Sequence, residues 1–340
     1  MTRVVAIILH AVPDAAAGPL EIAFAEARAA NARRLARGFE RLGATSRVED
    51  VRPGGLPFGA RLRAAARADP GAGLVILGSG SIPLASTADL RAFVGAAAEG
   101  PVLANNRYSS DVIAIPATTS LAGLPDLTSD NALPRWFAER GLPVADLARR
   151  WRLQVDLDSP IDVHLAGRAG QDPAFDRVRD AAGRLRAASR DPAAELLVAG
   201  RTSASTLRWL ERSTASRTRA VVEERGMRTA PSGQRPARSV LGRALDHAGP
   251  GALGTFLAEL ADGALVDSRV LLAHRLGAAE SGWPPAEDRF ASDLLLHERI
   301  TDPWLRELTR SAAEASIPIF LGGHTLVGPG LRLLLREPAR

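Results

Sequence analysis

The sequence predicts an α/β protein in which helices cover both faces of a mostly parallel sheet, followed by a mixed, largely helical C-terminal domain. Short apolar runs alternate with Ala-, Leu- and Arg-rich helical stretches through the first half of the chain. These runs lack polar alternation, which is typical of strands buried on both faces of a parallel sheet. The length of 340 residues suits two domains, which we expect over residues 1–190 and 191–340.

The first half follows a β-α-β-α order. The apolar run at residues 4–9 is too short for a signal peptide, because it soon meets His10 and Pro13, and it predicts a buried first strand. Further strands are expected at 45–51, 74–77, 101–104 and 112–115. Helical patterns cover residues 20–42, 58–68, 87–98, 130–150 and 172–190.

The rest of the chain has weaker signals. An alternating strand at 151–157 ends in acids, and Ser159 and Pro160 then open a helix, because Pro is well tolerated in a first helical turn. Strands are expected at 195–199 and 317–321, and helices from about 203 to 212 and over 237–248 and 252–261. The polar stretch at 214–239 includes a loop at 231–233.

The composition excludes several kinds of chemistry. All 43 strongly basic residues are arginines, so a Schiff-base lysine and a Walker A phosphate loop are both excluded. The absence of cysteine excludes thiolate nucleophiles, disulfides and cysteine-bound metals. Any phosphate binding must therefore depend on Arg side chains, hydroxyl groups and backbone N–H groups.

Charge and hydropathy argue against two classes of partner. The net charge is +5, acids are spread among the arginines, and 4% aromatic residues offer few stacking surfaces for a nucleic acid. No apolar run approaches the ~18 residues that span a bilayer. We therefore expect a cytoplasmic protein without a nucleic-acid or membrane partner, and a homodimer remains open.

Polar loops follow three of the expected strands, after Leu9, Leu77 and Ala104. Open parallel sheets bind ligands outside the carboxyl ends of their strands. We therefore expect ligand-binding residues in the loops after the second and third of these strands. These residues are Ser79, Gly80, Ser81, Asn105, Asn106 and Arg107. Ordinary strand-to-helix turns are the alternative, since Gly, Ser and Asn are also common turn residues.

Two motifs carry a resemblance to a known family. The first is Gly80-Ser81-Ile82-Pro83-Leu84, and the second is Asp156-Leu157-Asp158-Ser159-Pro160-Ile161-Asp162. Over residues 1–190 the chain resembles the nucleotidyltransferases of the GT-A-like fold, in particular the molybdenum-cofactor nucleotidyltransferases and the 2-phospholactate guanylyltransferases.

This resemblance implies a Rossmann-like fold and a magnesium-dependent reaction. A nucleoside monophosphate would pass from a nucleoside triphosphate to a small phosphorylated or hydroxylated acceptor. Asp158 would be the catalytic Mg²⁺ ligand, with Asp156 supporting it. The loop Ser79-Gly80-Ser81 would hold the nucleotide, and Asn105, Asn106, Arg107 and Asp111 would line the acceptor side.

Two departures from the family pattern leave other functions open. Ser81 stands where the family has Asp, and the loop after residue 9 carries no basic residue. These departures favour a non-catalytic regulatory or scaffold protein. The sequence Asp156-Leu157-Asp158 also has the form of the metal motif in glycosyltransferases that use sugar nucleotides. Both acids can alternatively cap the following helix.

Overall fold

The computed structural model describes residues 2–52, 54–127, 130–224 and 236–336, and it divides the chain into two compact units. The first unit contains residues 1–17 and 22–157, and the second contains residues 18–21 and 158–340. The segment from 158 to 190, expected in the first domain, belongs to the second unit. It does so because its helices contact strands and helices of that unit.

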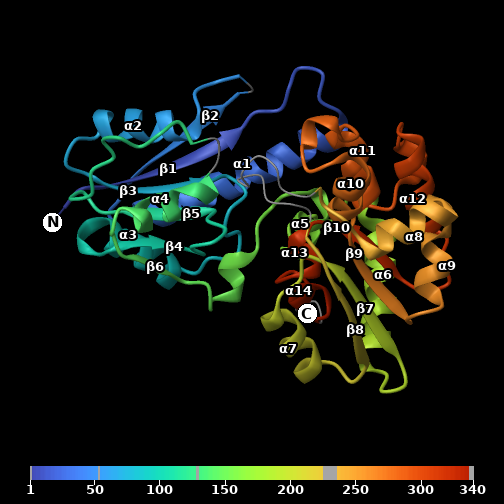
Figure 1. Cartoon of the computed structure of the whole chain (residues 1–340). Coiled ribbons are helices and arrows are strands. Elements are labelled where there is room, and N and C mark those ends of the chain that lie inside the picture. Colours follow the sequence, from blue (N-terminus) through green and yellow to red (C-terminus); the bar gives the residue numbers. More distant parts are fainter. Residues whose placement is uncertain (1, 53, 128–129, 225–235, 337–340) are drawn as a thin grey trace. The chain divides into compact units, whose positions relative to one another are not determined.

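The sheet of the first unit has, among the described residues, the strand order β2-β1-β3-β5-β4-β6 (Figure 1). Its strands are β1 (Val4–Ala11), β2 (Thr45–Val51), β3 (Gly73–Gly78), β4 (Val102–Ala104), β5 (Val112–Ile115) and β6 (Val144–Asp146). Strand β1 runs parallel to β2 and β3, while β5 is antiparallel to β3 and β4. The prediction of a mostly parallel sheet is therefore confirmed.

Helices cover both faces of this sheet, as predicted. They are α1 (Pro19–Glu40), α2 (Phe58–Ala68), α3 (Thr87–Glu99) and α4 (Leu133–Glu139). Along β1, Ala6 and Ile8 pack with Leu35 of α1 on one face, whereas Ile7 packs with Leu62 of α2 on the other. Continuous apolar runs thus form strands here because both sides of each strand are buried.

The chain order around β1 creates a topological switch point in the first unit. From β1 the chain passes to β2 on one side, and it then returns to β3 on the other side of β1. The loops that leave β1 and β3 therefore diverge at the carboxyl edge of the sheet. Such a point is where open α/β sheets leave a crevice for ligands.

The sheet of the second unit is parallel throughout, with the order β10-β9-β7-β8 among the described residues. Its strands are β7 (Glu195–Gly200), β8 (Arg217–Val222), β9 (Gly263–Asp267) and β10 (Ile319–Gly322). The sequence predicted β7 and β10 but not β8 or β9. Strand β8 was missed because it is a largely exposed edge strand with polar side chains. Strand β9 is buried along its length and was missed although shorter strands were predicted.

Several helices complete the second unit. They are α5 (Pro160–Leu165), α6 (Asp176–Arg190), α7 (Ala204–Ser213), α8 (Val240–Ala248), α9 (Leu253–Ala258), α10 (Ser268–Leu276), α11 (Ala286–Asp293), α12 (Pro303–Ala313), α13 (His324–Val327) and α14 (Leu331–Leu334). In the described parts of the chain, no helix is both long and apolar enough to cross a bilayer. The loop expected at 231–233 lies outside the described residues.

Two local expectations were wrong. The helix expected over 130–150 ends at Glu139, because Gly141 adopts a φ of +73° and the chain then enters β6. The strand expected at 151–157 is instead a 3₁₀ helix, η2 (Trp151–Gln154). Only Asp156 keeps a strand-like pairing, an antiparallel bridge to Ser81.

Candidate functional site

A cleft of about 520 Å³ lies at the switch point of the first unit. Its lining includes Leu9 of β1, Leu77 and Gly78 of β3, and Asp111 just before β5. Three arginines, Arg28, Arg52 and Arg61, also line it. The cleft therefore combines the expected position for a ligand with a cationic wall.

The predicted loop Ser79-Gly80-Ser81 follows β3 directly, but its side chains are largely buried. Ser79 is fully buried and contacts His10 through its hydroxyl, with 3.1 Å between Oγ and Nδ1. Ser81 is 3% exposed, and its hydroxyl donates to the carbonyl oxygen of Asp111 at 3.0 Å. The two hydroxyls thus fix the loop, which lies at the carboxyl end of a strand as predicted.

The end of this loop is strained and strongly braced. Ile82 is fully buried with a φ of +42°, which a β-branched residue rarely adopts. The buried Asn31 of α1 donates to the carbonyl oxygens of Ser79 and Ser81, at 2.9 and 3.0 Å. Arg34 donates to the carbonyl oxygen of Ile82 at 3.0 Å. Strain held in this way is common at ligand-binding loops.

Arg28 of α1 is a cleft residue that sequence reasoning missed. Its Nε atom is buried and has no hydrogen-bond partner among the described residues. A Cβ atom on Gly80 would lie 3.0 Å from that Nε and 3.1 Å from Oδ1 of Asp156, so Gly80 leaves room for both groups. Burial, followed by the charge of Arg28, lowers the pKa of His10. No sequence motif marks Arg28 among the other arginines of its helix.

The second predicted loop, Asn105-Asn106-Arg107, orients the carboxylate of Asp111 and places the Arg107 guanidinium near the surface. Asn105 is fully buried, donates to Oδ2 of Asp111 at 2.9 Å and accepts from the Asp111 backbone N–H at 3.0 Å. Asn106 donates to Gln154 at 3.1 Å. Arg107 forms a largely exposed ion pair with Asp146. The loop therefore turns Asp111 toward a defined position at the cleft, whereas Arg107 is committed elsewhere.

The two acids of the second motif belong to different units. Asp156 lies in the first unit, where Oδ1 accepts from the backbone N–H of Leu157 at 2.9 Å. Asp158 lies in the second unit, and its Oδ2 is 3.4 Å from Nδ1 of His324. Both residues are near a helix start, but the side chain that caps α5 is Asp162, which forms a capping box with Ser159.

The expected Mg²⁺ ligands fit this arrangement poorly. Ser81 brings no charge, and Asp158 is the partner of an imidazole. The described residues hold no group of three His, Cys, Asp or Glu side chains suited to a metal. Mg²⁺ that arrives with phosphates needs only one or two carboxylates from the protein. Asp111, which lines the cleft, has the donor chemistry for that limited role.

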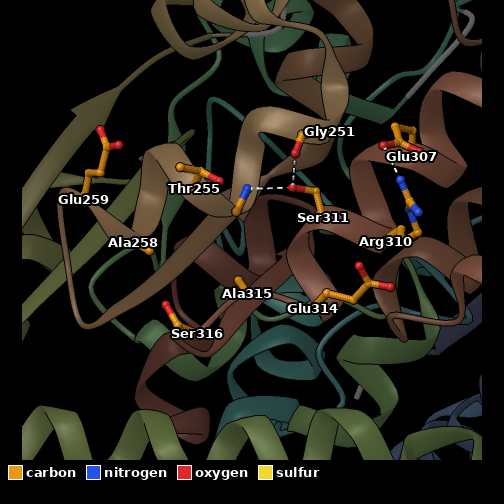
Figure 2. Close-up of a pocket in the computed structure, with 11 residues that line it drawn as sticks. Gly251, Thr255, Ala258, Glu259, Glu307, Arg310, Ser311, Glu314, Ala315 and Ser316 are labelled. Carbon is orange, nitrogen blue, oxygen red and sulfur yellow. Dashed lines mark hydrogen bonds and ion pairs between the residues drawn. The ribbon is translucent and has the colours of Figure 1, made fainter.

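Another hollow, of about 450 Å³, lies in the second unit between α9 and α12 (Figure 2). The Ser311 hydroxyl donates to the carbonyl oxygen of Gly251 at 2.7 Å, and Arg310 pairs with Glu307 at 2.6 Å. Figure 2 shows Glu259 and Glu314 as further carboxylates around it. The first contact joins α12 to the turn before α9 and the second lies within α12, and neither singles out a ligand.

The cleft of the first unit is therefore the best-supported candidate site. It lies at a topological switch point, a strained loop borders it, and a partly buried arginine reaches it. No protein-family model and no curated protein matches the chain. A function for this cleft must therefore be inferred from the geometry of its residues.

Proposed function

We propose that the first unit binds a nucleoside triphosphate, with its phosphates at the β1/β3 switch point, and that the protein is a nucleotidyltransferase. The observation that carries the proposal is Arg28, a cleft residue whose buried Nε has no hydrogen-bond partner among the described residues. A buried guanidinium nitrogen without a hydrogen-bond acceptor is costly, and a phosphate oxygen would accept that hydrogen bond and bring the opposite charge.

The surroundings of Arg28 suit a phosphate chain. Arg52 and Arg61 lie on the same cleft, so phosphates could be neutralised without lysine. Guanidinium groups bind phosphate oxygens through two parallel hydrogen bonds, which also fixes their direction. The strained loop after β3 begins next to Gly78, which lines the cleft, and it is held in place because α1 binds its carbonyl groups.

In the proposed reaction, an acceptor oxygen attacks the α-phosphorus, and pyrophosphate leaves. A magnesium ion bound with the triphosphate would neutralise charge on the phosphates. Asp111 would hold that ion, since Asn105 orients its carboxylate at the cleft. The arginines would keep the leaving pyrophosphate in place. The acceptor would be a small phosphorylated or hydroxylated compound.

One observation favours a second candidate, a nucleotide-binding protein without catalysis. The Ser81 hydroxyl, which stands where the resembling family has a metal-binding Asp, is committed to a backbone carbonyl. A regulatory protein would keep the phosphate site and lack the transfer step. Both candidates share the same binding cleft, so binding and turnover must be measured separately.

Isothermal titration calorimetry with the four common nucleoside triphosphates, each with and without Mg²⁺, tests the shared part. We expect at least one triphosphate to bind the wild type, and Arg28→Gln to lower its affinity by about tenfold or more, the effect of losing one charge-assisted hydrogen bond. Arg37→Gln is the matched control, because Arg37 lies on the exposed surface of the same helix.

Two results would overturn this proposal. The first is that no triphosphate binds at protein concentrations far above micromolar, and the second is that both Arg variants weaken binding equally. If binding holds, pyrophosphate release in the presence of phosphorylated and hydroxylated acceptors separates the enzyme from the regulatory protein.

A further inference from the structure

The second unit has a polar edge of its own. Its sheet is parallel, so the carboxyl ends of β7, β9 and β10 lie at one edge. Arg201 follows β7, Asp267 ends β9, and His324 opens α13 just after β10. Helix α13 contacts all three of these strands. This edge is where a parallel α/β sheet binds ligands, and it contains its own switch point between β7 and β9.

The arginines at this edge are held by buried carboxylates. Arg201 binds Asp267 through two hydrogen bonds, of 2.6 and 3.1 Å, and Asp267 is 1% exposed. Arg269 binds both oxygens of the fully buried Asp293 in the same manner, with 2.6 Å between Nη2 and Oδ2. Both guanidinium groups are therefore already neutralised by fork-like pairs, which leaves them little capacity for an anionic ligand.

Asp158 and His324 form a pair that is more accessible than these arginine–carboxylate contacts. Oδ2 of Asp158 is 3.4 Å from Nδ1 of His324, and their side chains are 52% and 36% exposed. The backbone N–H of Asp158 donates to Oδ2 of the buried Asp162 at 3.0 Å. His324 follows Gly323, and a Cβ placed on Gly323 would meet no atom within 4 Å. The carboxylate and the imidazole are thus both partly accessible to a ligand, and no atom fills the space beside Gly323.

Asp162, a buried residue next to this pair, has a carboxyl oxygen without a hydrogen-bond partner among the described residues. Asp162 is fully buried, and its Oδ1 has no hydrogen-bond partner among the described residues. Burial, followed by the negative charges of Asp158 and Asp293, raises the pKa of Asp162 well above its ordinary value. Asp158 is therefore the charged neighbour that acts most strongly on this unsatisfied carboxyl, which links the buried oxygen to the accessible pair.

From these contacts we infer that the Asp158–His324 pair is part of a second binding site, whose ligand is an uncharged polyhydroxylated compound of the sugar or polyol class. Carboxylate and imidazole groups both accept hydrogen bonds from hydroxyl groups. A neighbouring hydroxyl, or a water ordered by the ligand, would extend the network toward Asp162. The inference does not depend on nucleotide binding in the first unit.

The edge offers no uncompensated charge to a ligand. Arg201 and Asp267 neutralise each other, as do Arg269 and Asp293. The raised pKa of Asp162 favours its uncharged form, and Asp158 is paired with His324. A phosphate or an ammonium group would therefore meet no free counter-charge, whereas an uncharged ligand with several hydroxyl groups needs none.

The test uses sugars that differ only in charge. Pentoses, hexoses and cyclic polyols are added to the full-length protein as neutral, phosphorylated and amino forms, and the imidazole C–H signals are followed by NMR. The His324 signal is assigned with His324→Gln. We expect a neutral member of the panel to shift the His324 signal saturably, and Asp158→Asn to weaken that binding at least tenfold.

His297→Gln provides the matched control, because His297 is also a partly exposed imidazole near a carboxylate, 3.7 Å from Glu298 in the same unit. This variant should leave sugar binding unchanged, and circular dichroism should show that all variants are folded. The inference is overturned if no neutral compound binds, if the phosphorylated or amino forms bind more tightly, or if the His297 variant weakens binding as much as the His324 variant does. Loss of nucleotide binding elsewhere would leave this result unaffected.

Discussion

The carboxyl edges of the two sheets follow the same topological rule with opposite electrostatics. At the first edge, Arg28 reaches a cleft with a guanidinium nitrogen that has no partner among the described residues. At the second, Arg201 and Arg269 are each bound bidentately by a buried carboxylate. We therefore expect the two edges to bind ligands of different charge, because a guanidinium nitrogen lacks a hydrogen-bond partner among the described residues at the first edge and both arginines are paired at the second.

The largest expected effect comes from removing the buried Arg269–Asp293 ion pair at the second sheet edge. Arg269→Met leaves Asp293 buried without its counter-charge, and removing one partner of a buried ion pair typically costs about 3–5 kcal/mol. We expect the second unit to lose that much free energy of unfolding in urea denaturation of the full chain. Hydrogen exchange should place the loss in the second unit.

Arg310→Met is the control for that change. Arg310 also pairs with a carboxylate of the second unit, Glu307, but both side chains are solvent-accessible. Because water replaces such an interaction readily, this variant should change the stability little. Equal losses in the two variants would mean that the Arg269–Asp293 pair is not the buried anchor of this edge.

The sequence predicted the fold best where a strand is buried on both faces. The apolar runs that became β1 and β3 are buried on both faces, so composition alone marks them. Strand β8 escaped prediction because its edge position exposes most of its side chains, and its polar residues read as a loop. The second unit therefore contains a parallel sheet that its composition concealed.

The sequence predicted where the candidate loop lies in the fold, but not which contacts its side chains make. The sequence placed Ser79, Gly80 and Ser81 at a strand end, and the structure confirms that place. It could not show that the serine hydroxyls are consumed by internal hydrogen bonds, because those partners lie in other segments. Asp156 and Asp158, adjacent in one motif, belong to different units. Arg28 was invisible because only tertiary packing distinguishes it from neighbouring arginines.

A smaller change, Gly80→Ala, tests nucleotide binding at the first sheet edge. In Gly80→Ala, the new Cβ would lie 2.7 Å from the carbonyl oxygen of Leu157 and 3.0 Å from Nε of Arg28, so one of them must move. We expect nucleotide affinity to fall about tenfold, or ~1.4 kcal/mol. Calorimetric titration measures this nucleotide affinity. Sugar binding at the second sheet edge should not change.

Gly95→Ala is the matched control. A Cβ on Gly95 meets no atom within 4 Å, and Gly95 lies inside α3, where alanine is favoured by about 0.5–1 kcal/mol. This variant should be slightly more stable and bind nucleotide normally. If Gly80→Ala also binds normally, Arg28 and its loop do not hold the phosphates.

The last prediction distinguishes the two units by the pH dependence of their stability. His164 of the second unit is stacked on Phe175, with ring centroids 5.9 Å apart. Burial, followed by the charges of Arg179 and Arg186, lowers its pKa to about 4. In the unfolded chain the pKa is near 6.5. Protons thus bind the unfolded state more readily, so the second unit should lose stability as pH falls from about 6.5 to about 4.

Asp89 of the first unit behaves differently. Burial raises its pKa, but hydrogen bonds from Arg152, Ser86 and Arg150 outweigh that effect and lower the pKa below its ordinary value of 3.8. Its stabilisation is therefore fully present above that value and is lost only in stronger acid. The lowered pKa of His10 gives the first unit a loss of the same sign. Hydrogen exchange at pH 7 and pH 5 should nevertheless show a difference in stability between the two units, because the pKa of His164 is lowered to about 4. His164→Phe, which keeps a stacking ring without a titrating group, should reduce that difference, and an unchanged difference would assign it to other histidines of the unit.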